Sequence, residues 1–343
     1  MKAEKVAVLV SGGIDSAVTA YLLKQKGFEV VGVFMVLMHL DQPEQLEQRL
    51  RQAEKVCKTL DVPFHALAFS AHFKEKVFDP FMEAYAKGCT PNPCVKCNQS
   101  IKFGEAMDYV LNTLDVSRMA TGHYVRLIHE KQGYFLKKGL DPIKDQSYVL
   151  YTLNQKQLSQ VAFPLGDYLK EDIKAIAQQF MPEITFKGES VDLCFISSDY
   201  HSLLEDKEGF IVNKQGKVLG THKGIHRYTI GQRQGLGIAA PQPLYVIDIR
   251  PESREIVVGE KAEAFRREMT VCDIHSALPG ELENTIKAKA KIRYASPEQD
   301  CLSEPFGSKL KITFTEAQFA ITKGQSAVLY QEDRLLGGGI ICS

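Results

Sequence analysis

The stretch Lys5–Ser16, which reads KVAVLVSGGIDS, decides the fold of the first part of the chain. Its apolar run, Val6–Val10, is typical of a strand that is buried on both faces of a parallel sheet. The turn Ser11–Gly13 ends the run, and apolar residues then recur at helical spacing, so a helix is predicted to begin at Asp15 or Ser16. Glycine lets the backbone of such a turn approach a phosphate, and the N–H groups and the helix dipole favour an anion. The sequence therefore predicts an anion-binding site between this strand and this helix.

The segments that follow alternate between strand and helix patterns. Phe28–Val36 and Val62–Phe69 are predicted strands, and the polar segment Asp41–Leu60 between them is a predicted helix. Such alternation predicts a doubly wound parallel α/β sheet, in which ligands bind at the carboxyl ends of the strands. Met35 lies at such an end, where it either contacts an adenine or belongs to the core.

The character of the sequence changes near Phe210, where segments become shorter, richer in glycine and richer in β-forming residues. We therefore expect three domains: an α/β domain over residues 1–204, a small β-rich central domain over 205–261 and a β-barrel over 262–343. In the barrel, IKAKAKIRY at Ile286–Tyr294 alternates apolar residues with cations. The basic residues share one strand face, which is either a track for phosphates or a solvated lysine face.

Composition narrows the class of protein without identifying a partner. The 343 residues carry 42 Lys+Arg and 42 Asp+Glu, so the overall charge does not indicate a nucleic-acid partner, and any such surface must be local. No apolar run reaches the roughly 18 residues of a membrane span, and a cytoplasmic protein without membrane contact is expected. Eight cysteines in such a chain are expected to be free, catalytic or metal-bound rather than a set of structural disulfides.

Three of the cysteines lie in sequence contexts that suit chemistry. Cys94 and Cys97 form a C-x-x-C pair within Gly88–Asn98, a segment whose two prolines predict a rigid, exposed loop without helix. Cys194 lies far along the chain at a second predicted loop. Thiols held in this way act as nucleophile and resolving thiol or ligate a metal, and the alternative is that they are buried structural cysteines.

The turn sequence Ser-Gly-Gly-x-Asp-Ser at residues 11–16 is neither a Walker A loop nor the dinucleotide-binding G-x-G-x-x-G motif. It resembles the pyrophosphate loop of the ATP pyrophosphatases, whose fold is like that of the adenine nucleotide alpha hydrolases. Those enzymes split ATP into AMP and pyrophosphate, so the resemblance implies ATP and Mg²⁺ as cofactors. It also implies that Asp15 helps to hold Mg²⁺ and that the loop grips the pyrophosphate.

Further motifs, in the same order along the whole chain, resemble those of the bacterial tRNA-specific 2-thiouridylases. They are TPNPxxxCN at 90–98, IKF at 101–103, TGHY at 121–124, KDQSY at 144–148, FPLG at 163–166, CFI at 194–196, YTIGQR at 228–233, GQSAV at 324–328 and LGGGII at 336–341. The resemblance implies an ATP-dependent tRNA sulfurtransferase that adenylates the C2 oxygen of the wobble uridine and then replaces AMP with sulfur from a persulfide. Such a base must leave the anticodon stack to reach the site.

The resemblance also implies a site, residue by residue. It assigns catalysis to Cys97 as nucleophile and to Cys194 as persulfide carrier, which end in a disulfide with each other. It assigns ATP binding to Leu9, Val10, Ser11, Gly12, Gly13, Ile14, Asp15, Ser16, Met35 and Gly122. It assigns contact with the target base or the tRNA to Asn92, Pro93, Cys94, His123, Lys144, Asp145, Gln146, Arg293, Tyr294 and Gln325. The implied partners are tRNAs for Lys, Glu and Gln, with a sulfur-relay protein or a cysteine desulfurase as sulfur donor.

One departure from the family pattern leaves two mechanisms open. Many family members carry aspartate where this chain carries Cys94. With Cys94, Cys97 and Cys194, the chain either uses a cysteine persulfide or holds a [4Fe–4S] cluster by three thiolates, with one iron open to hydrosulfide. Two other classes of function are weighed as well. One is a different pyrophosphate-loop ligase that acts on a small molecule, and the other is a non-catalytic, RNA-binding iron–sulfur or nucleotide sensor.

Overall fold

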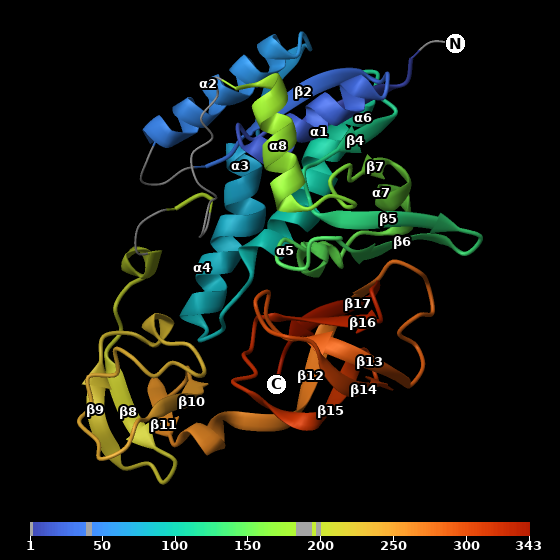
Figure 1. Cartoon of the computed structure of the whole chain (residues 1–343). Helices are drawn as coiled ribbons and strands as arrows, with labels where there is room; N and C mark the ends of the chain where they lie inside the picture. The colour runs from blue at the N-terminus through green and yellow to red at the C-terminus, as the bar shows by residue number, and fades with distance from the viewer. Residues whose placement is uncertain (1–2, 39–42, 183–193, 197–199) are drawn as a thin grey trace.

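The computed structural model describes residues 3–38, 43–182, 194–196 and 200–343. The first sheet of the chain is parallel, with the strand order β3-β2-β1-β4-β7. Figure 1 labels β2, β4 and β7 of this sheet. Its strands are β1 (Lys5–Leu9), β2 (Glu29–Val36), β3 (Phe64–Ala68), β4 (Arg118–Ala120) and β7 (Val161–Ala162). β1 runs through the middle of the sheet, paired in parallel with β2 and β4, as its uninterrupted apolar sequence predicts.

Helices cover both faces of this sheet, which confirms the predicted doubly wound α/β fold. They are α1 (Ile14–Gln25), α2 (Pro43–Thr59), α3 (Ser70–Phe73), α4 (Asp79–Ala86), α5 (Pro93–Cys97), α6 (Met107–Thr113), α7 (Gln155–Ser159) and α8 (Lys170–Phe180), with π-helical turns at Lys74–Phe78 and Asn98–Ala106. Val8 of β1 packs with residues of α1 and α2 in one buried cluster, whereas Ala7 packs with Phe103 and Met107 in another. Alternate residues of β1 therefore belong to two cores.

The prediction of a helix-free loop at residues 88–98 is wrong, because the structure forms the short helix α5 there. Pro93 is its first residue, and Asn92 is its N-cap, whose side-chain oxygen accepts a hydrogen bond from Cys94 N at 3.1 Å. Proline is tolerated at the first helical position, because the N–H that it lacks would have no partner within the helix. The helix continues directly into Asn98–Ala106, and Cys97 is consequently buried rather than exposed.

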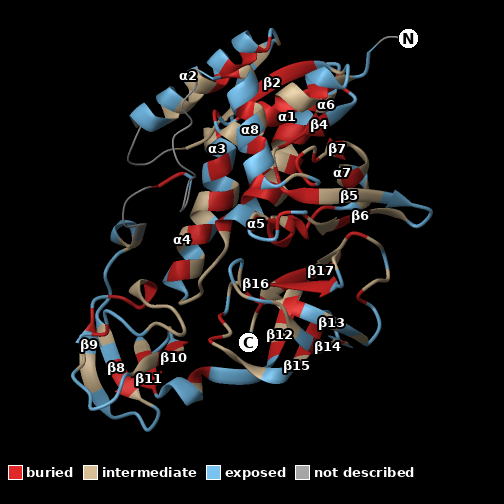
Figure 2. Ribbon diagram, viewed as in Figure 1, coloured by how far each residue is buried: buried red, intermediate tan, exposed pale blue. Residues whose placement is uncertain are grey.

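The C-terminal half of the chain contains a four-stranded sheet and a closed barrel, as predicted. The sheet has the order β10-β11-β8-β9, from β8 (Gly209–Asn213), β9 (Val218–His222), β10 (Tyr245–Arg250) and β11 (Glu255–Gly259). The barrel strands are β12 (Phe265–Ser276), β13 (Ile286–Lys291), β14 (Gln299–Phe306), β15 (Lys309–Phe319), β16 (Ser326–Gln331) and β17 (Arg334–Ile341). β17 pairs with both β16 and β12, which closes the barrel. In Figure 2, buried residues follow the middle strands of the first sheet and the barrel strands, whereas the outer side of α2 is exposed.

A disulfide joins Cys272 of β12 to Cys342, directly after β17. The expectation that the cysteines do not form structural disulfides is therefore wrong for this pair. The physical reason is that β12 and β17 pair side by side where the barrel closes, which brings together two cysteines 70 residues apart in sequence. The cysteines that remain thiols are Cys57, Cys89, Cys94, Cys97, Cys194 and Cys301.

The α/β domain and the barrel are connected through β structure and a backbone contact. The hairpin β5 (Val125–Glu130) and β6 (Gly133–Lys138) follows β4 in sequence, but β6 pairs with β17 of the barrel. Near α5, Thr90 N donates a hydrogen bond to Lys323 O at 2.9 Å. The barrel sheet therefore includes a hairpin that lies in sequence between β4 and β7 of the first sheet, and the domain boundaries stay predictions. None of the helices that the structure describes is long and apolar enough to cross a membrane.

Candidate active site

The turn between β1 and α1 is held in one conformation by local contacts. Gly12 has φ +79°, and a Cβ there would lie 2.6 Å from Arg49 O, so glycine is required. Ser11 N donates to Ser16 Oγ at 3.0 Å, and Ser16 Oγ donates to Gly13 O at 2.9 Å. The turn lines a polar cavity of about 740 Å³. A glycine turn and a helix N-terminus that open into a polar cavity suit a phosphate group.

A second, mostly apolar cavity of about 300 Å³ adjoins the first. Val33, Phe34 and Met35 of β2 form part of its wall, and Thr121–His123, which follows β4, forms another part. The residues that line both cavities are Ser11, Asp15, Arg49, Gln146 and Cys194. An apolar cavity joined to a polar one suits a nucleotide, with the base in the apolar cavity and the phosphates in the polar cavity.

The structure gathers all the residues predicted to bind ATP around these two cavities. Leu9, Val10, Ser16, Met35 and Gly122 line the apolar cavity, Gly12, Gly13 and Ile14 line the polar one, and Ser11 and Asp15 line both. Gly122 lies so close to α1 that a Cβ there would be 3.0 Å from the carbonyl carbon of Asp15. The contact of these residues with ATP stays a prediction.

Asp15, the predicted Mg²⁺ ligand, has two partners that sequence reasoning missed. Tyr124 OH donates to Asp15 Oδ1 at 2.6 Å, and Lys170 Nζ lies 2.7 and 2.8 Å from the two carboxylate oxygens. Both partners come from distant parts of the chain. Lys170 is the first residue of α8, where the helix dipole disfavours a cation, and that unusual position is the signal that could have drawn attention to it.

The three predicted thiols lie near one another beside these cavities. Cys194 lines both cavities, and its thiol acts electrostatically on Cys94 and Cys97. Burial raises the pKa of the Cys97 thiol to about 12, although the nearby cation Lys102 opposes the shift. Cys94 is an exposed residue, but the protein around its sulfur removes water and so raises the pKa of its thiol. The nearby Cys194 raises this pKa further. Both thiols of α5 are therefore protonated at neutral pH and must lose a proton before they act as nucleophiles.

The predicted iron–sulfur site is not preformed in the described part of the chain. No group of three or more His, Cys, Asp or Glu side chains gathers closely enough there to hold a metal ion. Cys94, Cys97 and Cys194 are thus neighbours without forming such a group. Residues 183–193, directly before Cys194, lie outside the described residues.

His123, a predicted tRNA contact, is buried in the wall of the apolar cavity. Its Nδ1 lies 2.7 Å from Thr121 Oγ1, and its ring contacts Phe103 and Phe163. Burial lowers the pKa of His123 well below its usual value of 6.5, and Lys102 adds to the shift. The ring is therefore neutral at pH 7, where it serves as a hydrogen-bonding group rather than as a cation.

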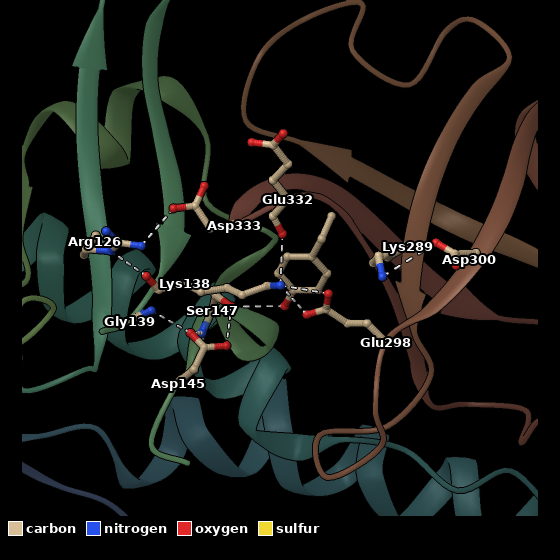
Figure 3. Close-up of polar contacts among 11 residues, drawn as sticks. Arg126, Lys138, Gly139, Asp145, Ser147, Lys289, Glu298, Asp300, Glu332 and Asp333 are labelled. Atoms are coloured by element: carbon tan, nitrogen blue, oxygen red, sulfur yellow. Dashed lines mark hydrogen bonds and ion pairs between the residues drawn. The ribbon is translucent and has the colours of Figure 1, made fainter. Parts of the chain in front are cut away.

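Residues 139–147 form a loop that presents some of the predicted tRNA contacts and hides another. Lys144 and Gln146 line the polar cavity. Asp145 instead points into the protein, where its Oδ1 accepts hydrogen bonds from two backbone N–H groups of the loop at 3.0 and 3.2 Å (Figure 3). Its Oδ2 accepts a hydrogen bond from Ser147 Oγ at 2.8 Å. The carboxylate of Asp145 therefore shapes the loop that carries its neighbours.

A partly buried polar cluster connects this loop to the barrel (Figure 3). Ser147 Oγ lies 3.1 Å from the hydroxyl of Tyr330, which belongs to β16. Lys138, at the end of β6, lies 2.6 Å from Glu298 Oε1 and donates to Glu332 O at 3.0 Å. Its ammonium is also 4.9 Å from the centre of the Tyr330 ring. The position of the loop therefore depends on the barrel.

The basic strand of the barrel is shorter than predicted. β13 ends at Lys291, and Lys287 and Lys289 are its exposed cations. Arg293 lies beyond the strand and turns into the protein, where its Nη2 donates to Ala320 O at 2.6 Å. Arg293 therefore does not continue the lysine face, because the alternation of side chains ends with the strand. Whether the remaining face contacts phosphates stays a prediction.

The other residues predicted to contact tRNA lie in the polar cavity and at two further places. Tyr294 lines the polar cavity beside Lys144. Gln325 Nε2 donates to Thr90 O at 2.8 Å, so it connects the barrel to the segment before α5. Asn92 and Pro93 line a separate, mostly apolar cavity of about 450 Å³ between α5 and the barrel.

The fold and the site define an α/β class of protein in which a glycine turn opens into a polar cavity near three thiols, with two β domains attached. Family models match successive parts of the chain: the tRNA methyl transferase HUP domain at residues 4–198, the tRNA methyl transferase PRC-barrel domain at 200–260 and the aminomethyltransferase beta-barrel domain at 266–341. The tRNA-specific 2-thiouridylase MnmA 1 of Clostridium tetani is 43% identical over 350 residues, which cover 98% of this chain and 96% of that protein. The tRNA-specific 2-thiouridylase MnmA of Clostridioides difficile is 41% identical over 354 residues, 98% of each chain. The chain belongs to the tRNA-specific 2-thiouridylase family.

Similarity to solved structures is weaker and covers part of the chain. The U34-tRNA thiolase NcsA from Methanococcus maripaludis, with its [4Fe–4S] cluster, matches 59% of this chain and 64% of its own length. Its sequence identity is 16% and the TM-score is 0.38.

Proposed function

We propose that this chain is an ATP-dependent tRNA sulfurtransferase that forms 2-thiouridine at the wobble position of the anticodon. Its membership of the 2-thiouridylase family along the whole chain supports thiolation of a tRNA uridine. The observation that carries the proposal is that Cys194 lines both joined cavities, between the glycine turn and the thiols of α5. Activation by a nucleotide and transfer of sulfur can therefore take place at one site. Because tRNA and ATP are its substrates, we place the reaction in the cytoplasm.

The first half-reaction in this proposal is adenylation of the target base. The adenine of ATP lies against Met35 in the apolar cavity, and the phosphates lie at residues 11–13 in the polar one. Asp15 helps to hold Mg²⁺, which neutralises phosphate charge when it is bound. The C2 oxygen of uridine attacks the α-phosphorus, and the bond to pyrophosphate breaks. The N–H groups of the turn then stabilise the leaving pyrophosphate.

The second half-reaction replaces AMP with sulfur. The terminal sulfur of a persulfide on Cys194 attacks C2, and AMP leaves with the former C2 oxygen. Cys97 loses its proton to solvent, and its thiolate attacks Sγ of Cys194, which breaks the S–S bond and releases 2-thiouridine. A Cys97–Cys194 disulfide remains, which an external dithiol reduces. Lys102 favours the thiolate of Cys97 electrostatically, against the effect of burial.

A second candidate mechanism rests on Cys94, the third thiol. Three thiolates suit a [4Fe–4S] cluster chemically, but the described residues form no metal-binding group, so no step is derived through a cluster. Iron and acid-labile sulfide in protein purified without oxygen separate the two mechanisms. Cluster iron that is lost in each of the Cys94→Ala, Cys97→Ala and Cys194→Ala variants supports the cluster. Full thiolation from a persulfide donor without iron supports the Cys194 persulfide.

The experiment that tests the proposed function is ATP–pyrophosphate exchange with and without unmodified tRNA. We expect exchange that depends on tRNA, and the tRNAs for Lys, Glu and Gln are the first to test. The Asp15→Ala variant should lose this exchange. Exchange driven by a small molecule alone would identify a different ligase. Absence of any turnover with tRNA, ATP and either a sulfur-relay protein or a cysteine desulfurase would indicate a sensor instead.

A further inference from the structure

Lys170 reaches from the start of α8 to the polar cavity. Its side chain is 8% exposed, and its ammonium lies 2.7 and 2.8 Å from the two carboxylate oxygens of Asp15. Its backbone N donates to Asp141 Oδ2 at 3.0 Å, which anchors the first turn of the helix. Lys170 lines the same cavity as Gly12 and Gly13. A largely buried cation therefore lies at the cavity that suits the phosphates of a nucleotide.

The partners of Asp15 leave its carboxylate little capacity for a metal ion. A carboxylate has about four lone-pair sites. Lys170 contacts both oxygens, and Tyr124 OH donates to one of them at 2.6 Å. A divalent cation takes carboxylate oxygens as ligands, so Mg²⁺ at Asp15 competes with Lys170 for the same two oxygens. A phosphate in the cavity that Lys170 lines would pair with the ammonium, and pairing offsets the cost of a buried charge.

We propose that Lys170 is a phosphate-binding residue that exchanges partners. It holds Asp15 before the nucleotide binds, and it moves its ammonium onto a phosphate of Mg²⁺–ATP while Asp15 turns to the metal. The charges stay paired throughout, since Asp15 gains Mg²⁺ and Lys170 gains phosphate. The inference rests on the proposed function for the identity of the ligand, and it predicts that Mg²⁺ and pyrophosphate assist each other's binding.

Calorimetric titration with Mg²⁺–pyrophosphate tests this inference directly. We expect Lys170→Met to bind pyrophosphate about 10- to 100-fold more weakly than the wild type, because it loses a charge-assisted hydrogen bond. Lys174→Met is the matched control, since Lys174 is an exposed lysine one turn further along α8, and its affinity should not change. Wild-type affinity in a folded Lys170→Met variant would overturn the proposal.

A second variant keeps the test decisive if Lys170→Met does not fold. Asp15→Asn releases Lys170 from its ion pair, so we expect it to bind Mg²⁺-free pyrophosphate several-fold more tightly than the wild type. Glu171→Gln is the control, because it removes the same negative charge from an exposed residue next to Lys170. It measures how much affinity is gained when a carboxylate simply no longer repels pyrophosphate. Equal or weaker binding by Asp15→Asn would contradict the exchange. These binding measurements need no tRNA, so they can contradict the exchange of partners while the wild type still thiolates tRNA. If the proposed function is wrong, the wild type itself does not thiolate tRNA.

Discussion

The hydroxyl of Tyr330 donates a hydrogen bond to Ser147 Oγ, 3.1 Å away, across the junction between the barrel and the α/β domain. The direction of this bond follows from proton counting. Ser147 has one hydroxyl proton, and it donates that proton to Asp145 Oδ2 at 2.8 Å. Tyr330 must then supply the proton between the two hydroxyls. The barrel thus holds the loop that carries Lys144 and Gln146 into the polar cavity.

Tyr330→Phe removes this hydrogen bond and keeps the ring in the core. We expect a loss of about 1 kcal/mol in the free energy of unfolding, together with a several-fold lower thiolation rate and an unchanged affinity for ATP. A double-mutant cycle with Ser147→Ala checks this, with the free energy of unfolding and the thiolation rate as the two measured quantities. The double variant should lose about as much as Ser147→Ala alone, because Ser147→Ala removes the bond to Tyr330 as well as the bond to Asp145. Strictly additive losses would show that the two hydroxyls act independently.

Gly122→Ala should weaken nucleotide binding. The new Cβ would lie 3.0 Å from the carbonyl carbon of Asp15 and 3.1 Å from Ser16 N, so the start of α1 must shift. Such overpacking costs about 1–3 kcal/mol, which corresponds to an affinity for ATP that is roughly tenfold or more weaker. Gly220→Ala is the control, because its Cβ would meet nothing closer than an Ile238 side-chain carbon at 3.7 Å. Unchanged ATP affinity in Gly122→Ala would separate Gly122 from the nucleotide site.

The buried His123 makes stability depend on pH. Its pKa is well below 6.5 in the folded protein, whereas in the unfolded chain it stays near 6.5, so the unfolded state binds the proton first. The contribution of His123 to the free energy of unfolding is therefore complete above pH 6.5. It falls by up to about 1.4 kcal/mol per pH unit as the pH drops below 6.5. Urea unfolding at pH 7.5, 6.5 and 5.5 measures the effect. His123→Gln should lose less stability than the wild type between pH 6.5 and 5.5, and equal losses would contradict this origin.

Two substitutions separate the capping role of Asn92 from its predicted contact with the target base. Its side-chain oxygen caps α5 by accepting from Cys94 N, and its amide is also predicted to meet the target base. Asn92→Ala should lower the free energy of unfolding by about 1 kcal/mol, whereas Asn92→Asp keeps the acceptor and should restore stability. If the amide contacts the base, Asn92→Asp still binds tRNA more weakly than the wild type. Wild-type tRNA affinity in Asn92→Asp would leave Asn92 with a capping role alone.

The local parts of the fold and the site could be predicted from the sequence. The run Val6–Val10 indicates a fully buried strand, because every residue of such a strand faces one of two cores. The glycine turn that follows could be predicted as well, because a tight turn with a positive φ and a close backbone approach, here to Arg49 O, requires glycine at Gly12. The helix α5 could also have been predicted, had Pro93 been read as a first helical residue rather than as a helix breaker.

The contacts between distant segments could not be predicted in this way. Nothing local to Asp15 indicates Tyr124 or Lys170. Lys170 reaches Asp15 because α8 packs beside α1, and Tyr124 reaches it because β4, which precedes Tyr124, pairs with β1. The pairing of Cys272 with Cys342 likewise depends on the register of two barrel strands. Such contacts follow from the topology of the fold, and the periodicity of apolar residues along the sequence does not indicate which strands become neighbours.

In the proposed reaction, the chain forms 2-thiouridine in tRNA with sulfur that passes through Cys194. The direct measurement is mass spectrometry of nucleosides from tRNA incubated with ATP, Mg²⁺ and a persulfide donor that carries isotopically labelled sulfur. The account predicts labelled 2-thiouridine with the wild type and none with Cys194→Ser, which should still release pyrophosphate when it adenylates the tRNA. Labelled 2-thiouridine formed by Cys194→Ser at the wild-type rate would contradict the account.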